Sequence, residues 1–219
     1  MNILVTAGNT QTPIDRVRCL TNIFSGRTGA NIALRGVERG HTVTLLTSHP
    51  EVLLPLSPPR IVLYRTFEDL DSAMALAIST GGFDAVIHAA AVNDYLLAGT
   101  FAKVNGEIVD VSAGKVKGNH EELWLQFRPA PKLVDKIRND WHFTGTLVKF
   151  KLEVVVGDTE LLEIAERSRV HSHANWMVAN TLEGRHEWAF IGAGPNGYHR
   201  VTRADLADTI IERIERLSH

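Results

Sequence analysis

The feature that most constrains the fold is the alternation of short apolar runs with helical patterns along almost the whole chain. The apolar runs predict strands over residues 3–6, 41–47, 61–65, 85–91, 147–150, 176–180 and 187–191. Apolar residues at helical spacing predict helices over 30–39, 68–79, 158–169 and 204–217, with Gly40 as the C-cap residue of the first. Strands that alternate with helices are typical of a mostly parallel sheet with helices on both faces. We therefore expect one doubly wound α/β domain over residues 1–219.

Residues 95–131 break this alternation. They contain no good helical pattern, residues 122–127 alternate apolar and polar side chains, and we expect residues 108–111 to pair with them. A segment of this length without helices inside a compact α/β domain usually has a function of its own. We predict that it forms a flap or a dimerisation arm.

Composition excludes several classes of protein. The net charge of the 219 residues is −2, which gives no overall attraction to nucleic acids or anionic membranes. Cys19 is the only cysteine, so an internal disulfide is excluded and a reducing compartment is favoured. No apolar run approaches the roughly 18 residues of a membrane span, and the N-terminus does not resemble a signal peptide. We expect a soluble cytoplasmic protein that binds neither nucleic acid nor membrane.

The segment SGRTG at residues 25–29 is the main local signal for anion binding. The dinucleotide fingerprint G-x-G-x-x-G and the P-loop are both absent. Ser25 could cap the following helix, and Gly26 and Gly29 could let the backbone approach an anion. Arg27 lies at the positive end of the helix dipole, where a cation is mildly unfavourable. A bound anion at this position would offset that repulsion. The alternative is a solvated helix start with an incidental arginine, and the residues alone leave both interpretations open.

The longer stretch LVTAGNTQTPIDRVRCLTNIFSGRTG at residues 4–29 resembles the N-terminal pattern of the phosphopantothenate–cysteine ligases, VTAGGTxEPIDxVRxITNxSSGxMG. Five further segments follow in the order of that family: AAAVNDY (89–95), GKVKG (114–118), RPAPKLV (128–134), LVKFKLE (147–153) and WMVAN (176–180). The resemblance spans residues 3–181 and implies a Rossmann-like fold. The chain resembles the stand-alone form of the family, which lacks the flavin-dependent decarboxylase domain that is fused to many bacterial versions.

The resemblance implies a carbon–nitrogen ligase of coenzyme A biosynthesis, also called phosphopantothenoylcysteine synthetase. In this reaction the carboxylate of 4'-phosphopantothenate attacks the α-phosphate of a nucleoside triphosphate and releases pyrophosphate. The amine of L-cysteine then displaces the nucleotide from the acyl-nucleotide and forms an amide. The implied cosubstrate is CTP with Mg²⁺, with ATP possible and no flavin. The family also implies a homodimer in which the flap region contacts the neighbouring subunit.

The resemblance assigns three groups of site residues. The first group is catalytic and comprises Asn22, which holds the acyl-nucleotide, Arg18 beside it, and Lys115 of the mobile flap. The second group contacts the nucleotide and comprises Ala90, Asp94, Pro131, Lys132, Leu133, Val134 and Phe150. The third group, Ser25, Gly26, Arg27 and Gly29, would bind phosphate. No metal ligand is assigned to the protein.

The chain departs from the family pattern at Phe24, Arg27, Asn93 and Lys149. Lys149 replaces a glycine, so we expect it, like Phe24, to narrow the space for base or substrate. The lysines that hold the nucleotide in the family are not clearly present before residues 176–180. Arg167, Arg169 and His171 are the candidates to replace them.

Three alternative functions stay open. A related nucleotide-dependent acid–amine ligase and an inactive nucleotide-binding paralogue would both keep most of these motifs. An NAD(P)-dependent short-chain reductase is disfavoured, because the glycine fingerprint is missing and Tyr95 starts no Tyr-x-x-x-Lys pair.

Overall fold

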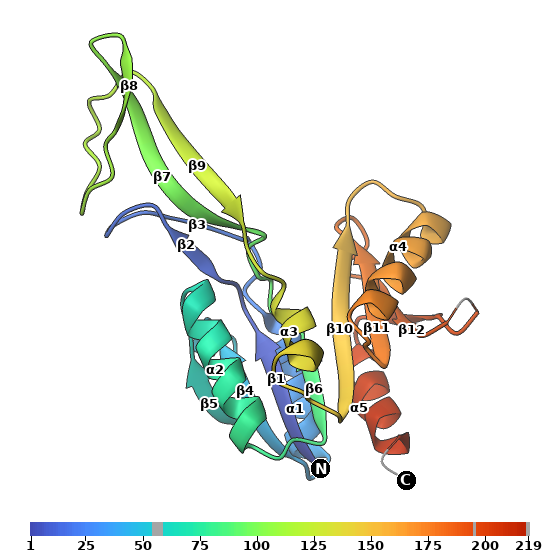
Figure 1. The fold of residues 1–219 in the computed structure, drawn as a ribbon. Helices are drawn as coiled ribbons and strands as arrows, with labels where there is room; N and C mark the ends of the chain where they lie inside the picture. The colour runs from blue at the N-terminus through green and yellow to red at the C-terminus, as the bar shows by residue number, and fades with distance from the viewer. Residues whose placement is uncertain (54–58, 195, 218–219) are drawn as a thin grey trace.

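The computed structural model describes residues 1–53, 59–194 and 196–217, and its centre is an eight-stranded sheet (Figure 1). The strand order is β13-β12-β11-β10-β6-β1-β4-β5. The strands are β1 (Asn2–Ala7), β4 (Thr42–Thr47), β5 (Arg60–Leu63), β6 (Ala85–His88), β10 (Thr146–Glu153), β11 (Trp176–Thr181), β12 (Trp188–Gly192) and β13 (His199–Thr202). The six strands from β5 to β11 are parallel, while β12 and β13 are antiparallel additions. The parallel strands have the order 3-2-1-4-5-6 of a Rossmann fold, so the expected fold class is confirmed.

Helices cover both faces of this sheet, because successive residues of each strand point to opposite faces. On one face, α1 (Arg27–Glu38) and α5 (Leu206–Arg216) pack over a core that includes Ile3, Val148 and Val178. On the other face, α2 (Phe67–Thr80), α3 (Leu133–Asn139) and α4 (Asp158–His171) pack over Leu4, Leu147 and Met177. None of the described helices is long and apolar enough to cross a membrane.

Short elements and element ends differ most from the sequence predictions. Helix α1 begins at Arg27 rather than at residue 30, and β6 ends at His88 rather than at residue 91. The strands β2 (Gln11–Pro13), β3 (Cys19–Thr21) and β13, the single turn η1 (Pro50–Val52) and the helix α3 were not predicted. Each of these has seven residues or fewer, which is too short for a periodic pattern to stand out.

Residues 95–131 form a separate three-stranded sheet, which extends away from the main sheet as an arm (Figure 1). Its strands are β7 (Tyr95–Val104), β8 (Glu107–Asp110) and β9 (Leu123–Pro129), in the order β8-β7-β9. The predicted absence of a helix is confirmed, but the predicted pairing of residues 108–111 with 122–127 is wrong. Strand β8 pairs with β7 instead, because Asn105 and Gly106 form a two-residue turn with positive φ of 52° and 87° that joins them directly.

Candidate functional site

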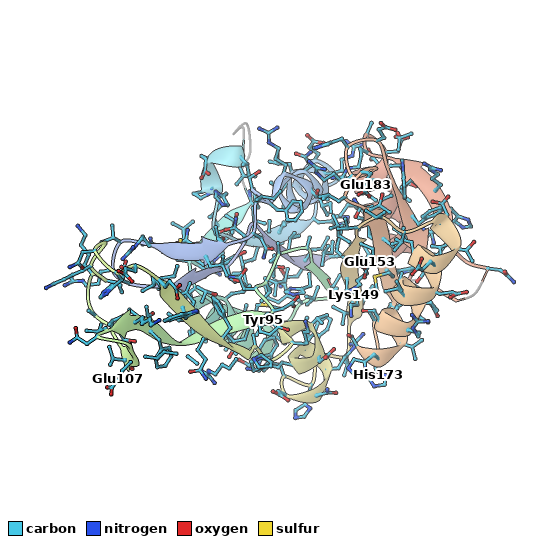
Figure 2. The ribbon with its side chains drawn as sticks, turned by 90° about the horizontal axis from the view of Figure 1, so that it is seen from above. Tyr95, Glu107, Lys149, Glu153, His173 and Glu183 are labelled. Carbon is cyan, nitrogen blue, oxygen red and sulfur yellow. The ribbon has the colours of Figure 1, made fainter. Side chains whose placement is uncertain are left out.

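The candidate site is a cavity of about 320 Å³ at the carboxyl ends of β6 and β10. In doubly wound sheets, ligands bind in the crevice outside this edge. Figure 2 shows Lys149, one of the residues that line the cavity, between the arm side of the molecule and the α4 side. The lining residues come from four places in the chain. They are His88 at the end of β6 with residues 90 and 92–94 after it, Pro131 to Asp135 at the start of α3, Lys149 to Lys151 on β10, and Ser168, His171 and Ser172 at the end of α4.

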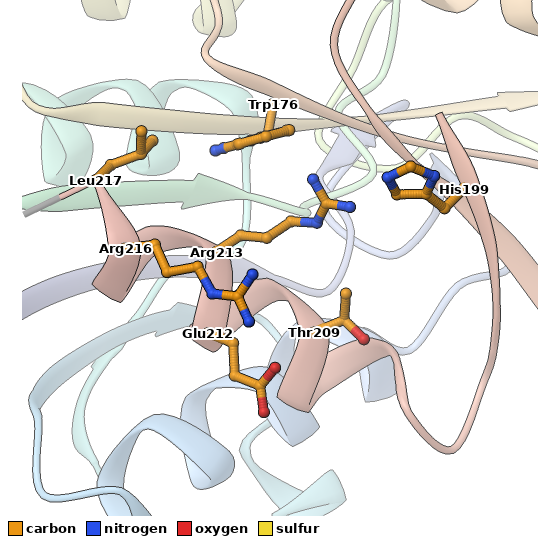
Figure 3. A pocket seen from close by; sticks show the side chains of 7 residues that line it. All are labelled: Trp176, His199, Thr209, Glu212, Arg213, Arg216 and Leu217. Atoms are coloured by element: carbon orange, nitrogen blue, oxygen red, sulfur yellow. The ribbon is translucent and has the colours of Figure 1, made fainter. Parts of the chain in front are cut away.

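A second cavity, of about 380 Å³, lies at the amino-terminal end of β11, beside α5 (Figure 3). It is formed by Trp176 at the beginning of β11 and by residues of α5 that include Arg213 and Arg216. The guanidinium carbon of Arg213 lies 4.5 Å from the centre of the Trp176 ring, an arrangement that stabilises the helix against the strand. Since this cavity is at the amino end of the parallel strands, it is not the expected place for a nucleotide.

All seven residues predicted to contact the nucleotide line the first cavity. They are Ala90, Asp94, Pro131, Lys132, Leu133, Val134 and Phe150. Three separate sequence motifs contribute to this set, and the fold brings them together where the parallel strands end. Their proximity makes one ligand site possible, and nucleotide binding by them stays a prediction.

Asp94 and Lys132 form an ion pair at the exposed part of the cavity. Their Oδ1 and Nζ atoms are 2.5 Å apart, and the two side chains are 67% and 58% exposed. An ion pair that is exposed to this degree contributes little stability. Both side chains can therefore exchange this contact for one with a ligand at small cost.

The inner wall of the cavity carries two buried titratable side chains, His88 on β6 and Lys149 on β10. They are directly opposite each other in the strand register. Burial, with a smaller contribution from Lys149, lowers the pKa of His88 to about 4, so this ring is neutral at pH 7. Its Nδ1 lies 2.9 Å from the hydroxyl oxygen of Thr6. Burial also lowers the pKa of Lys149, to about 8.

Asn22 lies next to the cavity, directly after β3. Its Nδ2 donates to the carbonyl of Ala91 at 3.1 Å and to Oδ1 of Asn93 at 2.9 Å. The backbone carbonyl of Asn22 accepts a hydrogen bond of 2.7 Å from Nδ2 of Asn9. The side chain is therefore held in place beside Asn93, which lines the cavity. Both N–H groups of Asn22 already have partners, so it must exchange one of them to donate to a ligand.

The structure does not place Arg18 beside Asn22. Strands β2 and β3 form a hairpin, with Arg18 at its turn and Asn22 at its other end, roughly 13 Å away along extended chain. The Arg18 guanidinium binds the carboxylate of Asp15 and donates to the carbonyl of Val116 at 2.7 Å. The backbone N–H of Val116 in turn donates to Asp15 at 3.1 Å. Arg18 therefore joins the hairpin to the loop between β8 and β9.

Lys115 lies in that same loop and is exposed. It is held next to the hairpin turn by its neighbours, since Val116 is buried and the carbonyl of Gly114 accepts a hydrogen bond from Arg16. Lys115 is not among the residues that line the 320 Å³ cavity of the described chain. The predicted catalytic lysine is thus positioned on the arm side, away from the predicted nucleotide contacts.

The two glycines of SGRTG are required by packing of α1 against β1. A Cβ atom on Gly26, whose φ is +82°, would lie 2.1 Å from the backbone nitrogen of Gly8. A Cβ atom on Gly29 would lie 2.7 Å from the Cβ of Ala7. Both glycines are therefore explained by close contacts with the end of β1, and Gly29 is buried. Phosphate binding by Ser25, Gly26, Arg27 and Gly29 stays a prediction.

The prediction that Ser25 caps α1 is wrong. The N-cap residue is Gly26 in the left-handed conformation, and no side chain caps the helix. Because Gly26 must pass close to Gly8, the chain turns one residue later than a serine cap would require. Arg27 is the first residue of the helix and is exposed, while Arg203 from the chain after β13 contacts the hydroxyl of Thr28. No sequence motif indicated that Arg203 would be a second cation near the start of this helix.

The positions that depart from the family pattern have different environments. Lys149 lines the cavity, and its Nζ is directed to Ser168 and Ser172 of the α4 segment. Phe24 is half-buried and is not among the lining residues. Of the three candidates to replace the family lysines, His171 lines the cavity, whereas Arg169 is paired with Glu166 at 2.7 Å.

Arg167, the third candidate, is exposed on α4 and is also not among the described lining residues. Ser168, Ser172 and Asp135 also line the cavity and were not predicted from the sequence. Their only signal was their position near the ends of helices, which is common for these residue types.

Comparison with known proteins identifies the family of the chain. The family model of the DNA/pantothenate metabolism flavoprotein C-terminal domain matches residues 1–216. The coenzyme A biosynthesis bifunctional protein CoaBC of Thermococcus kodakarensis is 29% identical over 220 residues, which are 98% of this chain and 51% of that protein. The protein of the same name from Escherichia coli K12 is 37% identical over 182 residues, 83% of this chain and 41% of that protein. The chain spans about half the length of these curated relatives.

Among solved structures, the DNA/pantothenate metabolism flavoprotein from Streptococcus pneumoniae is 26% identical and superposes with a TM-score of 0.85. The superposition covers 99% of each chain, so the arm and the main sheet are both included. The chain belongs to the family of the DNA/pantothenate metabolism flavoprotein C-terminal domain.

Proposed function

We propose that the chain is a phosphopantothenate–cysteine ligase of coenzyme A biosynthesis. The observation that carries the proposal is the convergence of Ala90, Asp94, residues 131–134 and Phe150 on one cavity at the carboxyl ends of β6 and β10. These positions were assigned to one ligand from sequence resemblance alone. The membership of the family, whose curated relatives take part in coenzyme A biosynthesis, supports the proposal.

The chemistry fits a site without a protein nucleophile. The carboxylate of 4'-phosphopantothenate attacks the α-phosphate of the nucleotide, and pyrophosphate leaves. The cysteine amine then attacks the acyl carbon, loses one proton, and releases the nucleoside monophosphate. Both steps gather negative charge, which fixed cations and N–H donors can stabilise. Three lysines, Lys132, Lys149 and Lys151, line the cavity and supply such cations.

We infer that Mg²⁺ arrives with the nucleotide and would be held jointly by its phosphates and by the protein. In the described part of the chain, no three His, Cys, Asp or Glu side chains come together in a way that could hold a metal ion. Two carboxylates, those of Asp94 and Asp135, line the cavity. Mg²⁺ is commonly held by one or two carboxylates together with substrate phosphates, so these residues fit the ion. When bound, the ion would neutralise part of the phosphate charge.

We also propose that the arm forms the interface of a homodimer. Four apolar side chains of β8 and β9 are exposed on it: Ile108 (67%), Val109 (36%), Leu123 (39%) and Trp124 (38%). Exposed apolar side chains that gather on one small sheet are typical of a protein interface. A second copy of the chain is the partner that the family resemblance implies.

The decisive assay measures pyrophosphate release by the purified protein with 4'-phosphopantothenate, L-cysteine, Mg²⁺ and either CTP or ATP. We expect one nucleotide to support release of one pyrophosphate for each phosphopantothenoylcysteine, identified by its mass. Without cysteine, release should stop after about one turnover per site. The assignment fails if neither nucleotide supports cysteine-dependent product formation. Comparing CTP with ATP in the same assay identifies the cosubstrate, for which CTP is our proposal.

A further inference from the structure

Lys149 carries a positive charge into the buried wall of the cavity. The residue as a whole is 6% exposed, and its Nζ atom has only neutral hydrogen-bond partners. Nζ donates to the carbonyl and to Oγ of Ser168, both at 3.0 Å, and to Oγ of Ser172 at 2.6 Å. Among the described residues, no carboxylate oxygen lies within 4.0 Å of it. Buried charges are normally paired with an opposite charge, so the partner of Lys149 is missing from the chain itself.

The surrounding charges do not supply that partner. The nearest acid is Asp135 on α3, which reaches Lys149 only through Ser172, whose Oγ donates to Asp135 at 2.5 Å. On β10, Lys151 is paired with Glu153, and before α3 Lys132 is paired with Asp94. These three contacts leave the buried ammonium of Lys149 without a directly bound anion.

Two histidines also face this region. His88 on β6 is neutral at pH 7 because burial lowers its pKa to about 4. His171 at the end of α4 lies 3.4 Å from Asp135 and is exposed. Of the three lysines that line the cavity, Lys132 is paired with Asp94 and Lys151 with Glu153. Among the described residues, Lys149 is the lining lysine without a directly paired carboxylate. The cavity is therefore suited to a ligand with negative charge.

We infer that Lys149 binds a phosphate group of the ligand in this cavity, with the hydroxyl groups of Ser168 and Ser172 as its neighbours. The inference rests on the proposed function, which supplies phosphorylated ligands. A lysine ammonium is a compact charge that suits a phosphate oxygen, and Lys149 lines the cavity from its inner wall. The phosphate can come from the nucleoside triphosphate or from phosphopantothenate. The nucleotide is favoured because Ala90, Asp94 and Phe150 share the same cavity.

A phosphate at this position has a consequence that can be measured. In the protein without ligand, the pKa of Lys149 is lowered to about 8, mainly by burial and to a smaller extent by the charges of Lys151 and Lys132. The negative charge of Asp135 acts in the opposite direction and raises this pKa. A bound phosphate favours the charged form of the lysine and raises its pKa again. Binding therefore takes up a proton above pH 8, so affinity falls as the pH rises. Between pH 7 and pH 9 we expect a loss of about tenfold from this one group.

The test measures dissociation constants by titration calorimetry for CTP, for ATP and for 4'-phosphopantothenate between pH 7 and pH 9. It uses the full chain, the variant Lys149→Met and the matched control Lys136→Met. Lys136 is also part-buried, but it is paired with Asp71 at 2.5 Å and does not line the cavity. We expect Lys149→Met to weaken nucleotide binding at least tenfold at pH 7 and to remove most of the pH dependence. Lys136→Met should keep both the affinity and its pH dependence.

A structural role of Lys149 predicts a different pattern. If it served only to stabilise the fold, Lys149→Met would lower the melting temperature of the free protein and leave the affinity of the remaining folded protein unchanged. We expect the reverse. The melting temperature of the free Lys149→Met variant should be unchanged or higher than that of the wild type, because an unpaired buried charge is removed. Addition of nucleotide should raise the melting temperature of the variant less than that of the wild type. If Lys149→Met does not fold, the pH dependence of nucleotide affinity in the wild-type protein still tests the inference. An affinity that does not change between pH 7 and pH 9 would overturn it.

The outcomes separate this inference from the proposed function. If the wild-type protein binds a nucleotide and Lys149→Met binds it equally well across the pH range, Lys149 is not a phosphate contact. If only phosphopantothenate binding is weakened by the variant, the phosphate contact is supported and the nucleotide is excluded as its source. If the wild-type protein binds neither CTP nor ATP, the proposed function itself is wrong, and the inference about Lys149 is wrong with it.

Discussion

Asn22 and Asn93 are joined by a hydrogen bond of 2.9 Å from Nδ2 of the first to Oδ1 of the second. Asn93 lines the cavity, and its own Nδ2 donates to the hydroxyl of Thr12 at 2.8 Å and to the carbonyl of Leu20 at 3.2 Å. The pair connects the hairpin of β2 and β3 to the segment after β6. It is the structural link between the predicted catalytic amide and the predicted nucleotide contacts.

Asn22→Asp should reduce turnover about 100-fold or more while nucleotide binding stays measurable. A carboxylate at this position would face two acceptors, the carbonyl of Ala91 and Oδ1 of Asn93, and would repel the charge that develops in the reaction. Product formation is measured by mass, and binding by calorimetry. Asn105→Asp, in the exposed turn of the arm, is the control and should keep full activity. Normal turnover by Asn22→Asp would remove Asn22 from its proposed role.

Lys115→Gln should lower kcat more than it raises the dissociation constant of the nucleotide. Lys115 is exposed and does not line the cavity among the described residues, so it contributes to chemistry only when its loop, or the loop of a second copy, approaches the ligand. Single-turnover and binding measurements separate the two effects. Lys103→Gln on β7 removes a similar exposed charge and should change neither. Equal rates for wild type and Lys115→Gln would contradict the catalytic assignment.

Asp15→Asn should loosen the loop that carries Lys115. The Asp15 carboxylate accepts hydrogen bonds from Arg18 and from the backbone N–H groups of Val17 and Val116, and these bonds, Arg18 first, hold its pKa well below the usual range. Amide exchange at Val116 should become faster in the variant.

The same contact gives a pH dependence whose sign follows from the lowered pKa. The stabilisation by Asp15 is fully present above the unfolded pKa of about 4 and is lost as the pH falls toward the folded value. In the wild-type protein, protection of Val116 relative to the protein core should therefore decrease only below about pH 4. Protection that is already lost at pH 6 would show that another group holds the loop.

Gly29→Ala should destabilise the protein by about 1–3 kcal/mol through overpacking, because the new methyl group would lie 2.7 Å from the Cβ of Ala7 and 3.0 Å from the carbonyl of Thr6. The free energy of unfolding in urea measures the effect. Gly118→Ala, where no heavy atom lies within 4 Å of the added carbon, is the control and should change it little. If both variants are equally stable, α1 can move away from β1 without cost.

Trp124→Glu should shift the protein from dimer to monomer. A charge on the exposed part of β9 would have to be buried in the proposed interface, which is costly. Light scattering across a concentration series measures the change. Arg60→Glu, on the edge strand β5 of the main sheet, is a control that should leave the dimer intact. A wild-type protein that is monomeric throughout would exclude the arm as a dimer interface.

The local arrangement of strands and helices was predictable from the sequence because it depends on short-range patterns. The helices α2, α4 and α5 lie within two residues of their predicted bounds, since each has enough apolar positions to define one face. Six ordered motifs were also enough to indicate the family. The residues of three of them meet at one cavity, because the carboxyl ends of parallel strands share an edge.

Contacts between distant segments were decided only by the tertiary structure. The pairing of β8 with β7, the separation of Arg18 from Asn22 and the packing of Gly26 against Gly8 each depend on where a distant part of the chain lies. The sequence by itself determined that Ala90, Asp94, residues 131–134 and Phe150 belong to one candidate site, because the motifs that contain them are local. Only the folded chain decided that Lys149 meets Ser168 and Ser172 there, because burial and the absence of a nearby carboxylate are properties of the packed structure.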